Sequence, residues 1–355
     1  MQTARNRRFP KPKMMTKSML MSASRRPTIR DVASEAGVSR GTVSRVLNGG
    51  RWVSDEAEAA VRAAIKKTGY RVNPHARSLA TQRTSCVALL LTEPQDLLFE
   101  DPNFSTLMRS AAPALAEKDH TLILIMAATK ADQHRALDFV TAGHVDGVLL
   151  VSTHTSNQGL VAGIHASKLP AVACGAPLGF ERTMSYVAAD DHDATVRIVD
   201  HLKSRGRHRI ATITGPLDTS GGQQRLAGYR HAVEPEFDPR LVANGDYSSA
   251  SGAAAMTQLL AAAPDLDAVF AANDRMAEGA LSILNRNGRR IPDDVAVAGF
   301  DDSPVATRCT PQLTTMRQPF ERISTEMVRL LLAEIGGDGV ASVILPAQLV
   351  VRAST

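Results

Sequence analysis

Residues 28–48 read TIRDVASEAGVSRGTVSRVLN, a stretch that predicts two short helices joined by a tight turn. Thr28 is a favourable N-cap, and Gly37 ends the first helix because glycine adopts the left-handed conformation that such a turn requires. Ser39 then caps the second helix. The apolar residues of the first helix recur at the spacing of one helical face, at Ile29, Val32, Ala33 and Ala36. A helix, a glycine turn and a second capped helix make a helix-turn-helix.

A third helix is predicted directly after this stretch. Ser54 caps it, acidic residues occupy its first turn, and Lys66 and Lys67 lie in its last turn, an order that matches the helix dipole. We therefore expect residues 27–72 to form a small all-α DNA-binding domain.

Basic residues are concentrated at the start of the chain. Residues 1–83 hold 18 of the 41 Lys and Arg residues but only 5 of the 36 Asp and Glu residues. This asymmetry favours a highly negative partner, a nucleic acid, over a basic tail that only aids solubility. Residues 1–26 contain no acidic residue and are expected to be a disordered basic extension that adds non-specific attraction to phosphates.

Residues 73–84 are predicted to be a hinge between domains. Asn73 and Pro74 form the start of a brief helical segment, with Asn as the cap and Pro in the first turn, and polar residues follow it.

From Cys86 onward, apolar runs of strand length alternate with helical stretches. These runs begin at Cys86, Thr121, Val145, Pro170, Arg209, Ala268 and Val295. Runs that are buried on both faces and separated by helices predict parallel sheets of βαβ units. Two such series predict that residues 85–355 form an α/β core of two doubly wound lobes. A ligand of such sheets binds at the carboxyl ends of the strands, in the cleft between the lobes.

The ordered motifs of the chain resemble those of the LacI/GalR family of repressors. They are D-V-A-x-x-A-G-V-S (residues 31–39), T-V-S-R-V-L-N (42–48), G-Y (69–70), N-P (73–74) and A-x-S-L-A (76–80). The resemblance covers residues 28–355 and implies a helix-turn-helix head on a periplasmic-binding-protein-like core that dimerises and binds an effector. It also implies a DNA-binding regulator, a repressor, whose operator affinity changes when a small molecule closes the lobes.

The resemblance assigns base reading to the second helix of the head. Arg40 and Gly41 occupy its first exposed positions, and Arg45 is the strongest candidate for direct readout, since Arg bonds guanine O6 and N7 together. Gly41 has no side chain, so readout at that position is confined to the backbone. Phosphate contact or docking support is implied for Thr28, Ser39, Thr42, Ser44, Asn48 and Ser54.

The hinge supplies three more DNA-contacting positions in this resemblance, Asn73, Leu79 and Ala80. The leucine corresponds to an apolar wedge that enters the minor groove at the centre of the operator and kinks it. Purely structural roles are the alternatives: Thr28 and Ser39 as caps only, and Leu79 as hinge packing.

The resemblance also implies an effector site in the core. Arg225, in RLAGY, matches a ligand-binding arginine, whose fork of donors suits ligand oxygens. Asn273, in AAND, and Asp301, in GFDD, lie at predicted strand ends and suit hydroxyl groups, whereas Tyr247 matches an aromatic that stacks on a sugar. Further candidates are Gln318, Asp101 and Phe104. The set favours a sugar. Three alternatives stay open: a nucleobase as the effector, a surface ion pair for Arg225, and a turn position for Asp301.

One head covers one half-site, so a homodimer on a near-palindromic, double-stranded operator is expected. The chain ends in LVVRAST (residues 349–355) without the heptad helix of the family's tetramers, which favours the dimer. Whether the effector releases DNA or recruits the protein to it stays open.

Several classes of protein are disfavoured by the sequence. No apolar run is long enough for a membrane span or a signal peptide, and the three cysteines are widely spaced, as in a cytoplasmic protein. No G-x-S-x-G, Walker A, post-strand G-x-G-x-x-G or metal-ligand spacing is present, so we expect no enzyme, no cofactor and no metal. A transport-type sugar-binding protein is the alternative, and the DNA-binding head argues against it.

Overall fold

The computed structural model describes residues 27–47, 53–70 and 83–355, and the chain divides into two compact units between Gln82 and Arg83. The predicted basic extension and most of the predicted hinge lie outside the described residues. So do four predicted DNA-contact positions, Asn48, Asn73, Leu79 and Ala80.

The described part of the first unit consists of the three predicted helices, α1 (Ile29–Ala36), α2 (Arg40–Leu47) and α3 (Asp55–Thr68). Thr28 donates to Asp31 Oδ2 from both its backbone N and its Oγ1, each at 2.7 Å. Ser39 Oγ accepts from the backbone N of Thr42 at 3.1 Å, and Gly37 follows α1 with φ 66°. Local capping chemistry therefore sets the ends of these helices, as the sequence predicts.

A small apolar cluster holds the three helices together. Val32 of α1, Val43 of α2 and Val61 of α3 are fully buried against one another. Ile29, Val46 and Ile65 are partly buried around them. Because each helix contributes one apolar stripe, its opposite face is left to the solvent.

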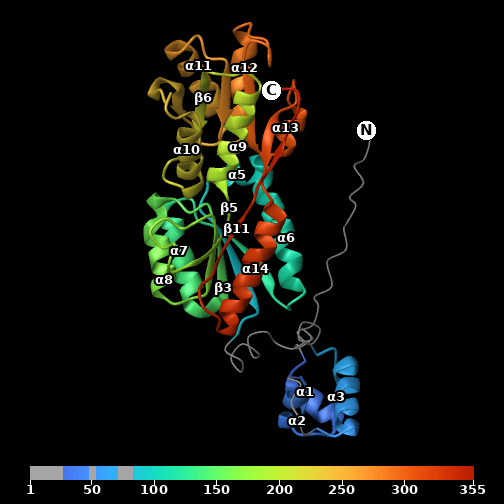
Figure 1. The fold of residues 1–355 in the computed structure, drawn as a ribbon. Helices are drawn as coiled ribbons and strands as arrows, with labels where there is room; N and C mark the ends of the chain where they lie inside the picture. Colours follow the sequence, from blue (N-terminus) through green and yellow to red (C-terminus); the bar gives the residue numbers. More distant parts are fainter. Residues whose placement is uncertain (1–26, 48–52, 71–82) are drawn as a thin grey trace, which may run out of the picture. The chain divides into compact units, whose positions relative to one another are not determined.

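The second unit contains two α/β lobes (Figure 1). The sheet of the first lobe is parallel throughout. Its strand order within residues 83–355 is β11 (Ser342–Leu345), β5 (Ser185–Ala189), β4 (Ala171–Cys174), β3 (Gly147–Val151), β1 (Cys86–Leu91) and β2 (Thr121–Met126). In β1, Leu89 packs toward α6 (Pro102–Ala116) and α14 (Phe320–Gly336), whereas Leu90 packs toward α7 (Lys130–Phe139) and α8 (Gln158–Ala166). Burial on both faces explains the uninterrupted apolar run.

The second lobe repeats this plan. The order of its strands is β12 (Gln348–Val350), β10 (Thr314–Arg317), β9 (Ala296–Asp301), β8 (Ala268–Ala271), β6 (Ile210–Thr214) and β7 (Val242–Asn244). Only β12 is antiparallel to its neighbour among the strand pairs of this described sheet. One face packs against α9 (Asp191–Ser204) and α10 (Ser220–Val233), and the other against α11 (Ser249–Ala262) and α12 (Asp274–Arg286). The predicted fold class is confirmed.

The chain passes between the lobes at three places. These are the links from β5 to α9, from β10 to α14, and from β11 to β12. Each link lies at the carboxyl end of a strand, so residues on the links, such as Asp191 and Gln318, lie beside the strand ends of both lobes.

Two expectations about the strands need correction. The run at Thr121 was expected to be buried on both faces, but β2 is an edge strand, and Leu124 is 40% exposed. In addition, the apolar runs did not predict β5, β7, β10, β11 and β12. These strands have only three to five residues and carry few consecutive apolar side chains, so pairing with neighbouring strands defines them.

Two short helices complete the second unit, α5 (Gln95–Glu100) and α13 (Pro304–Arg308). None of the helices that the structure describes combines the length and the apolar character that a bilayer span requires.

Candidate DNA-reading helix and effector cleft

The recognition-helix candidates lie on α2 as predicted. Arg40, Gly41 and Arg45 are exposed, whereas Thr42 and Ser44 are partly buried. Neither Arg40 nor Arg45 forms a salt bridge with another described residue. Two guanidinium groups on one short helix are thus available to an anionic or base-edge partner.

Three of the predicted phosphate-contacting residues cap helices. Thr28 and Ser39 cap α1 and α2, and Ser54 Oγ accepts from the backbone N of Ala57 at 3.3 Å at the start of α3. Capping is therefore their visible role, and contact with DNA stays a prediction for each.

All seven predicted effector residues line one cavity between the lobes of the core. Asp101 and Phe104 come from the first lobe, at the start of α6, and Gln318 comes from the link to α14. The second lobe supplies Arg225 from α10, Tyr247 after β7, Asn273 after β8 and Asp301 at the end of β9. Residues separated by more than 200 positions in the sequence thus share one wall, at the carboxyl ends of the strands. Their role in binding an effector stays a prediction.

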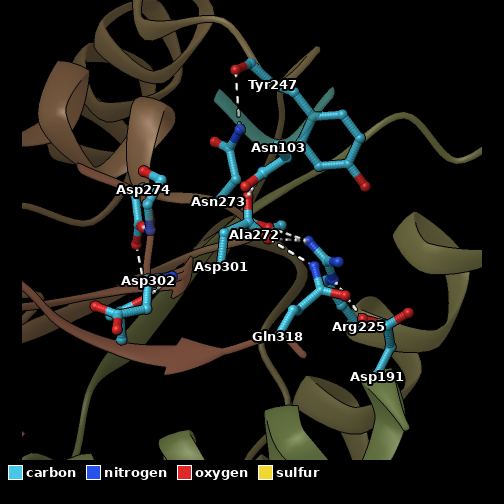
Figure 2. A network of polar contacts seen from close by, with 12 residues as sticks. Asn103, Asp191, Arg225, Tyr247, Ala272, Asn273, Asp274, Asp301, Asp302 and Gln318 are labelled. Atoms are coloured by element: carbon cyan, nitrogen blue, oxygen red, sulfur yellow. Dashed lines mark hydrogen bonds and ion pairs between the residues drawn. The ribbon is translucent and has the colours of Figure 1, made fainter. Parts of the chain in front are cut away.

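Arg225 is the central cation of this cleft (Figure 2). It is only 7% exposed, which excludes the surface ion pair that the sequence left open. Its Nε donates to Asp191 Oδ1 at 2.9 Å, its Nη1 donates to the carbonyl oxygen of Ala272, and its guanidinium carbon lies 3.9 Å from the centre of the Phe300 ring. Burial on its own lowers the pKa of Arg225, but the carboxylates of Asp191 and Asp301 raise it above its ordinary value.

Asp301 joins the two lobes through hydrogen bonds to amide groups. Its Oδ2 accepts from Asn103 Nδ2 of the first lobe at 2.9 Å, and its Oδ1 accepts from Gln318 Nε2 at 2.7 Å. Burial raises the pKa of the Asp301 carboxyl well above its ordinary value, although Arg225 opposes this shift. A hydroxyl-rich ligand would find carboxyl oxygens and amide groups here at both lobes.

The backbone at Asp301 is strained and is fixed by a buried carboxyl beneath it. Asp301 and Asp302 have φ of 107° and 58°, a region that side chains rarely adopt. Asp274 accepts from the backbone N of Ser303 at 2.7 Å and from Thr315 Oγ1 at 2.6 Å. Burial raises the pKa of Asp274 to about 7. Asp301 is thus the last residue of β9 with a strained backbone, and its side chain lines the cavity.

Asn273 and Tyr247 are linked to each other. Asn273 Oδ1 accepts from the backbone N of Met276 and caps α12, while its Nδ2 donates to the carbonyl oxygen of Tyr247 at 3.0 Å. The amide of Asn273 therefore keeps only one N–H and one lone pair for a ligand. The Tyr247 ring borders the cavity and has its centre 5.9 Å from the guanidinium carbon of Arg225.

The sequence did not predict seven further polar residues of the cavity: Glu93, Asn103, Ser152, Thr153, Asp191, Thr219 and Ser220. Asp191 follows β5, a strand that the apolar pattern did not predict, although the pair Asp190-Asp191 after the run SYVAA was a usable signal. Asn103 lies in the first turn of α6 and Glu93 in the loop after β1, and no motif marks either residue.

Part of the wall is apolar. Side chains of the first lobe form it, namely Leu97, Leu107, Val151, Val187, Phe320 and Ile323. A cavity whose lining combines hydrogen-bonding and apolar groups suits a sugar, which has both hydroxyl edges and C–H faces.

Comparisons with known proteins agree with this geometry. Residues 28–73 match the family model for bacterial regulatory proteins of the lacI family, and residues 199–355 match the model for the periplasmic binding protein-like domain. The HTH-type transcriptional regulator CelR of Thermobifida fusca is 42% identical over 340 residues, which are 94% of this chain and 100% of CelR. The chain belongs to the LacI family.

Solved structures extend the similarity of this LacI-family chain to the whole fold. A complex of CelR with cellobiose has a TM-score of 0.75 at 40% identity and covers 93% of this chain and 100% of its own. The Lac repressor dimer bound to operator and the anti-inducer ONPF has a TM-score of 0.81 at 27% identity, covering 93% and 99%. This LacI-family chain is a DNA-binding transcription regulator and not an enzyme.

No group of three or more His, Cys, Asp or Glu residues in residues 27–47, 53–70 and 83–355 is arranged to hold a metal ion.

A histidine also links the two lobes of this LacI-family chain. His154, after β3, lies with Nε2 2.8 Å from Glu93 Oε1 of its own lobe and Nδ1 2.9 Å from Asp218 Oδ1 of the second lobe. The hydrogen bond to Glu93 raises the pKa of His154 to about 9 with help from Asp218, although partial burial lowers it. A protonated imidazole donates to both carboxylates.

Replacing His154 by glutamine should lower the thermal stability of the full chain in a pH-dependent manner. A raised histidine pKa stabilises the folded state fully below the unfolded pKa of about 6.5 and no longer above the folded pKa. The free energy of unfolding of the unchanged chain should exceed that of His154→Gln by about 2 kcal/mol at pH 6, and this difference should vanish by pH 9.5. Thermal unfolding at both pH values measures it, with His208→Gln, an exposed histidine, as the control. An advantage that does not change with pH would show that His154 acts only by packing.

Proposed function

We propose that this chain is a cytoplasmic repressor that binds a near-palindromic operator as a homodimer, and that a sugar in the cleft controls its operator affinity. The observation that carries the proposal is the assembly of Arg225, Asp301, Asn273 and Gln318 in one cavity with an apolar wall. These groups match the hydroxyls of a sugar, and the cavity spans the two lobes, so ligand binding and lobe closure are coupled.

The relatives support both halves of this proposal. The CelR complex contains cellobiose, which makes that disaccharide the first candidate effector. The Lac repressor structure is a dimer on operator DNA, which supports the same assembly for this chain.

The free edge of the first lobe further supports a dimer. Leu124 of β2 is 40% exposed and Phe139 of α7 is 39% exposed, and an apolar edge strand is a ready surface for a second copy. Analytical ultracentrifugation of the full chain at micromolar concentration should give the mass of two chains. A monomer that persists on operator DNA would contradict the dimer.

The test of the function has two steps. Random duplex DNA is first selected by binding to the purified full chain, and the bound pool is sequenced. A near-palindromic site should be enriched. The affinity for this site is then measured with and without cellobiose and a panel of other sugars and nucleobases, and the effector should change it by roughly 5- to 150-fold. An unstructured DNA pool would contradict specific readout, and a site that no sugar affects would contradict the sugar effector.

Arg45→Ala is expected to weaken binding to the selected site by about 1–3 kcal/mol and to flatten the base preference at one position of each half-site. The reason is the loss of a fork of donors that bonds a guanine edge. A second selection with the variant measures the preference.

The control is Arg62→Ala on α3, an exposed arginine of the same head whose Nη2 pairs with Glu58 at 2.6 Å. Its base preference should match that of the unchanged chain. If Arg45→Ala weakens all sequences equally, Arg45 contacts phosphate instead of a base.

A further inference from the structure

Acidic side chains outnumber basic ones in the lining of the cavity. Glu93, Asp101, Asp191 and Asp301 are acidic, and Arg225 is the single Lys or Arg residue in the lining, which belongs wholly to the described residues 83–355. Burial raises the pKa of Asp101, Asp191 and Asp301, while the Arg225 guanidinium opposes this shift in each of them. Whether ionised or neutral, they offer no positive charge to a ligand.

The charge of Arg225 is already compensated by the protein. Asp191 receives its Nε–H at 2.9 Å, and Asp301 Oδ1 lies 3.9 Å from its Nη1. The carbonyl oxygen of Ala272 occupies Nη1 as well, and one face of the guanidinium lies on the Phe300 ring. Only the Nη2 edge of the Arg225 guanidinium is left to face the cavity, and its donors suit a hydroxyl oxygen.

The cations behind the cavity wall are compensated too. Arg275 pairs with Glu100, and His154 lies between Glu93 and Asp218. An anionic ligand would therefore compete with a carboxylate for Arg225, the cation that lines the cavity. It would also lose its hydration on entering the cleft, and a buried charge without a partner is unfavourable.

We infer that the cleft selects an uncharged, polyhydroxylated ligand and rejects its phosphorylated analogues, and that Asp191 is the residue that sets this selectivity. Asp191 does so by occupying the Nε edge of Arg225 and cancelling its charge from the start of α9. The inference rests on the proposed sugar effector and narrows it to neutral sugars.

The test is calorimetric titration of the full chain with matched pairs of ligands: cellobiose and cellobiose 6-phosphate, glucose and glucose 6-phosphate, ribose and ribose 5-phosphate. For the pair whose neutral member binds, the phosphate should bind at least about 100-fold more weakly. In Asp191→Asn, which keeps an oxygen for Arg225 Nε but removes the negative charge, the phosphate should gain about tenfold relative to the neutral sugar.

Asp193→Asn is the matched control, since Asp193 lies on the same helix with its side chain 60% exposed. This substitution should leave the affinities for the neutral sugar and for its phosphate unchanged. Equal or tighter binding of a phosphate by the unchanged chain would overturn the inference and leave the sugar effector standing. An unchanged ratio in a folded Asp191→Asn protein would overturn the role of Asp191. Binding of neither member of any pair would contradict the sugar effector itself, and the inference with it.

Discussion

Arg225→Met should lower the free energy of unfolding by about 3–5 kcal/mol near pH 7.5 and abolish the response of operator binding to the effector. Methionine has a similar length but no charge, so Asp191 and Asp301 would be left buried without the cation that lies 2.9 and 3.9 Å away. Removing one member of a buried ion pair costs far more than removing an exposed pair, because the remaining charge stays desolvated.

The decrease in the free energy of unfolding caused by Arg225→Met should depend on pH. Without Arg225, the two carboxyls lose the cation that lowers their pKa, while burial still raises it. An acid whose folded pKa is raised opposes folding above its unfolded pKa, and this penalty shrinks as the pH falls and the group binds a proton. Denaturant unfolding at pH 7.5 and pH 5.5 should therefore show a smaller loss at the lower pH.

Arg230→Met serves as the control for this experiment. Arg230 lies on the same helix, is exposed, and rests over the Phe237 ring at 5.1 Å. It should change stability by less than about 1 kcal/mol at either pH. Equal losses in the two variants would mean that the buried pair contributes nothing specific.

Gly279→Ala is expected to lower the free energy of unfolding by about 3 kcal/mol and to weaken effector binding as well. A Cβ atom at Gly279 of α12 would overlap the carbonyl oxygen of Ser249 in α11, and one at Gly252 of α11 would overlap the backbone of Met276 in α12. The two glycines let the helix backbones approach each other directly. Added volume must move α12, whose first turn carries Asn273 and Asp274.

The matched control is Gly336→Ala in the last turn of α14, where an added Cβ meets no atom within 4 Å. Alanine there should raise stability by about 0.5–1 kcal/mol, because it reduces the freedom of the unfolded chain. Denaturant unfolding and effector titration of both variants measure the effects. If Gly279→Ala is as stable as Gly336→Ala, the close contact of α11 and α12 is not needed.

The elements with local signals could be predicted from the sequence. The capped helices of the head and the apolar runs that became β1, β2, β3, β4, β6, β8 and β9 are set by neighbours within a few residues. The motifs around Arg225, Asn273 and Asp301 also identified these residues individually. The family assignment followed from motifs of the same local kind, and the comparisons confirm it.

Only the tertiary structure decided which residues meet. Asp191 pairs with Arg225 across 34 positions, and Asn103 donates to Asp301 across 198. No local pattern encodes such contacts, because they depend on how separate βαβ units stack and on where the chain passes between the lobes. The same holds for β11 and β12, which are close in sequence but join different sheets. The sequence thus determined the family and identified seven of the residues that line the cavity. The compensation of Arg225, on which the selectivity of the cleft depends, arises only when distant carboxylates are buried beside it.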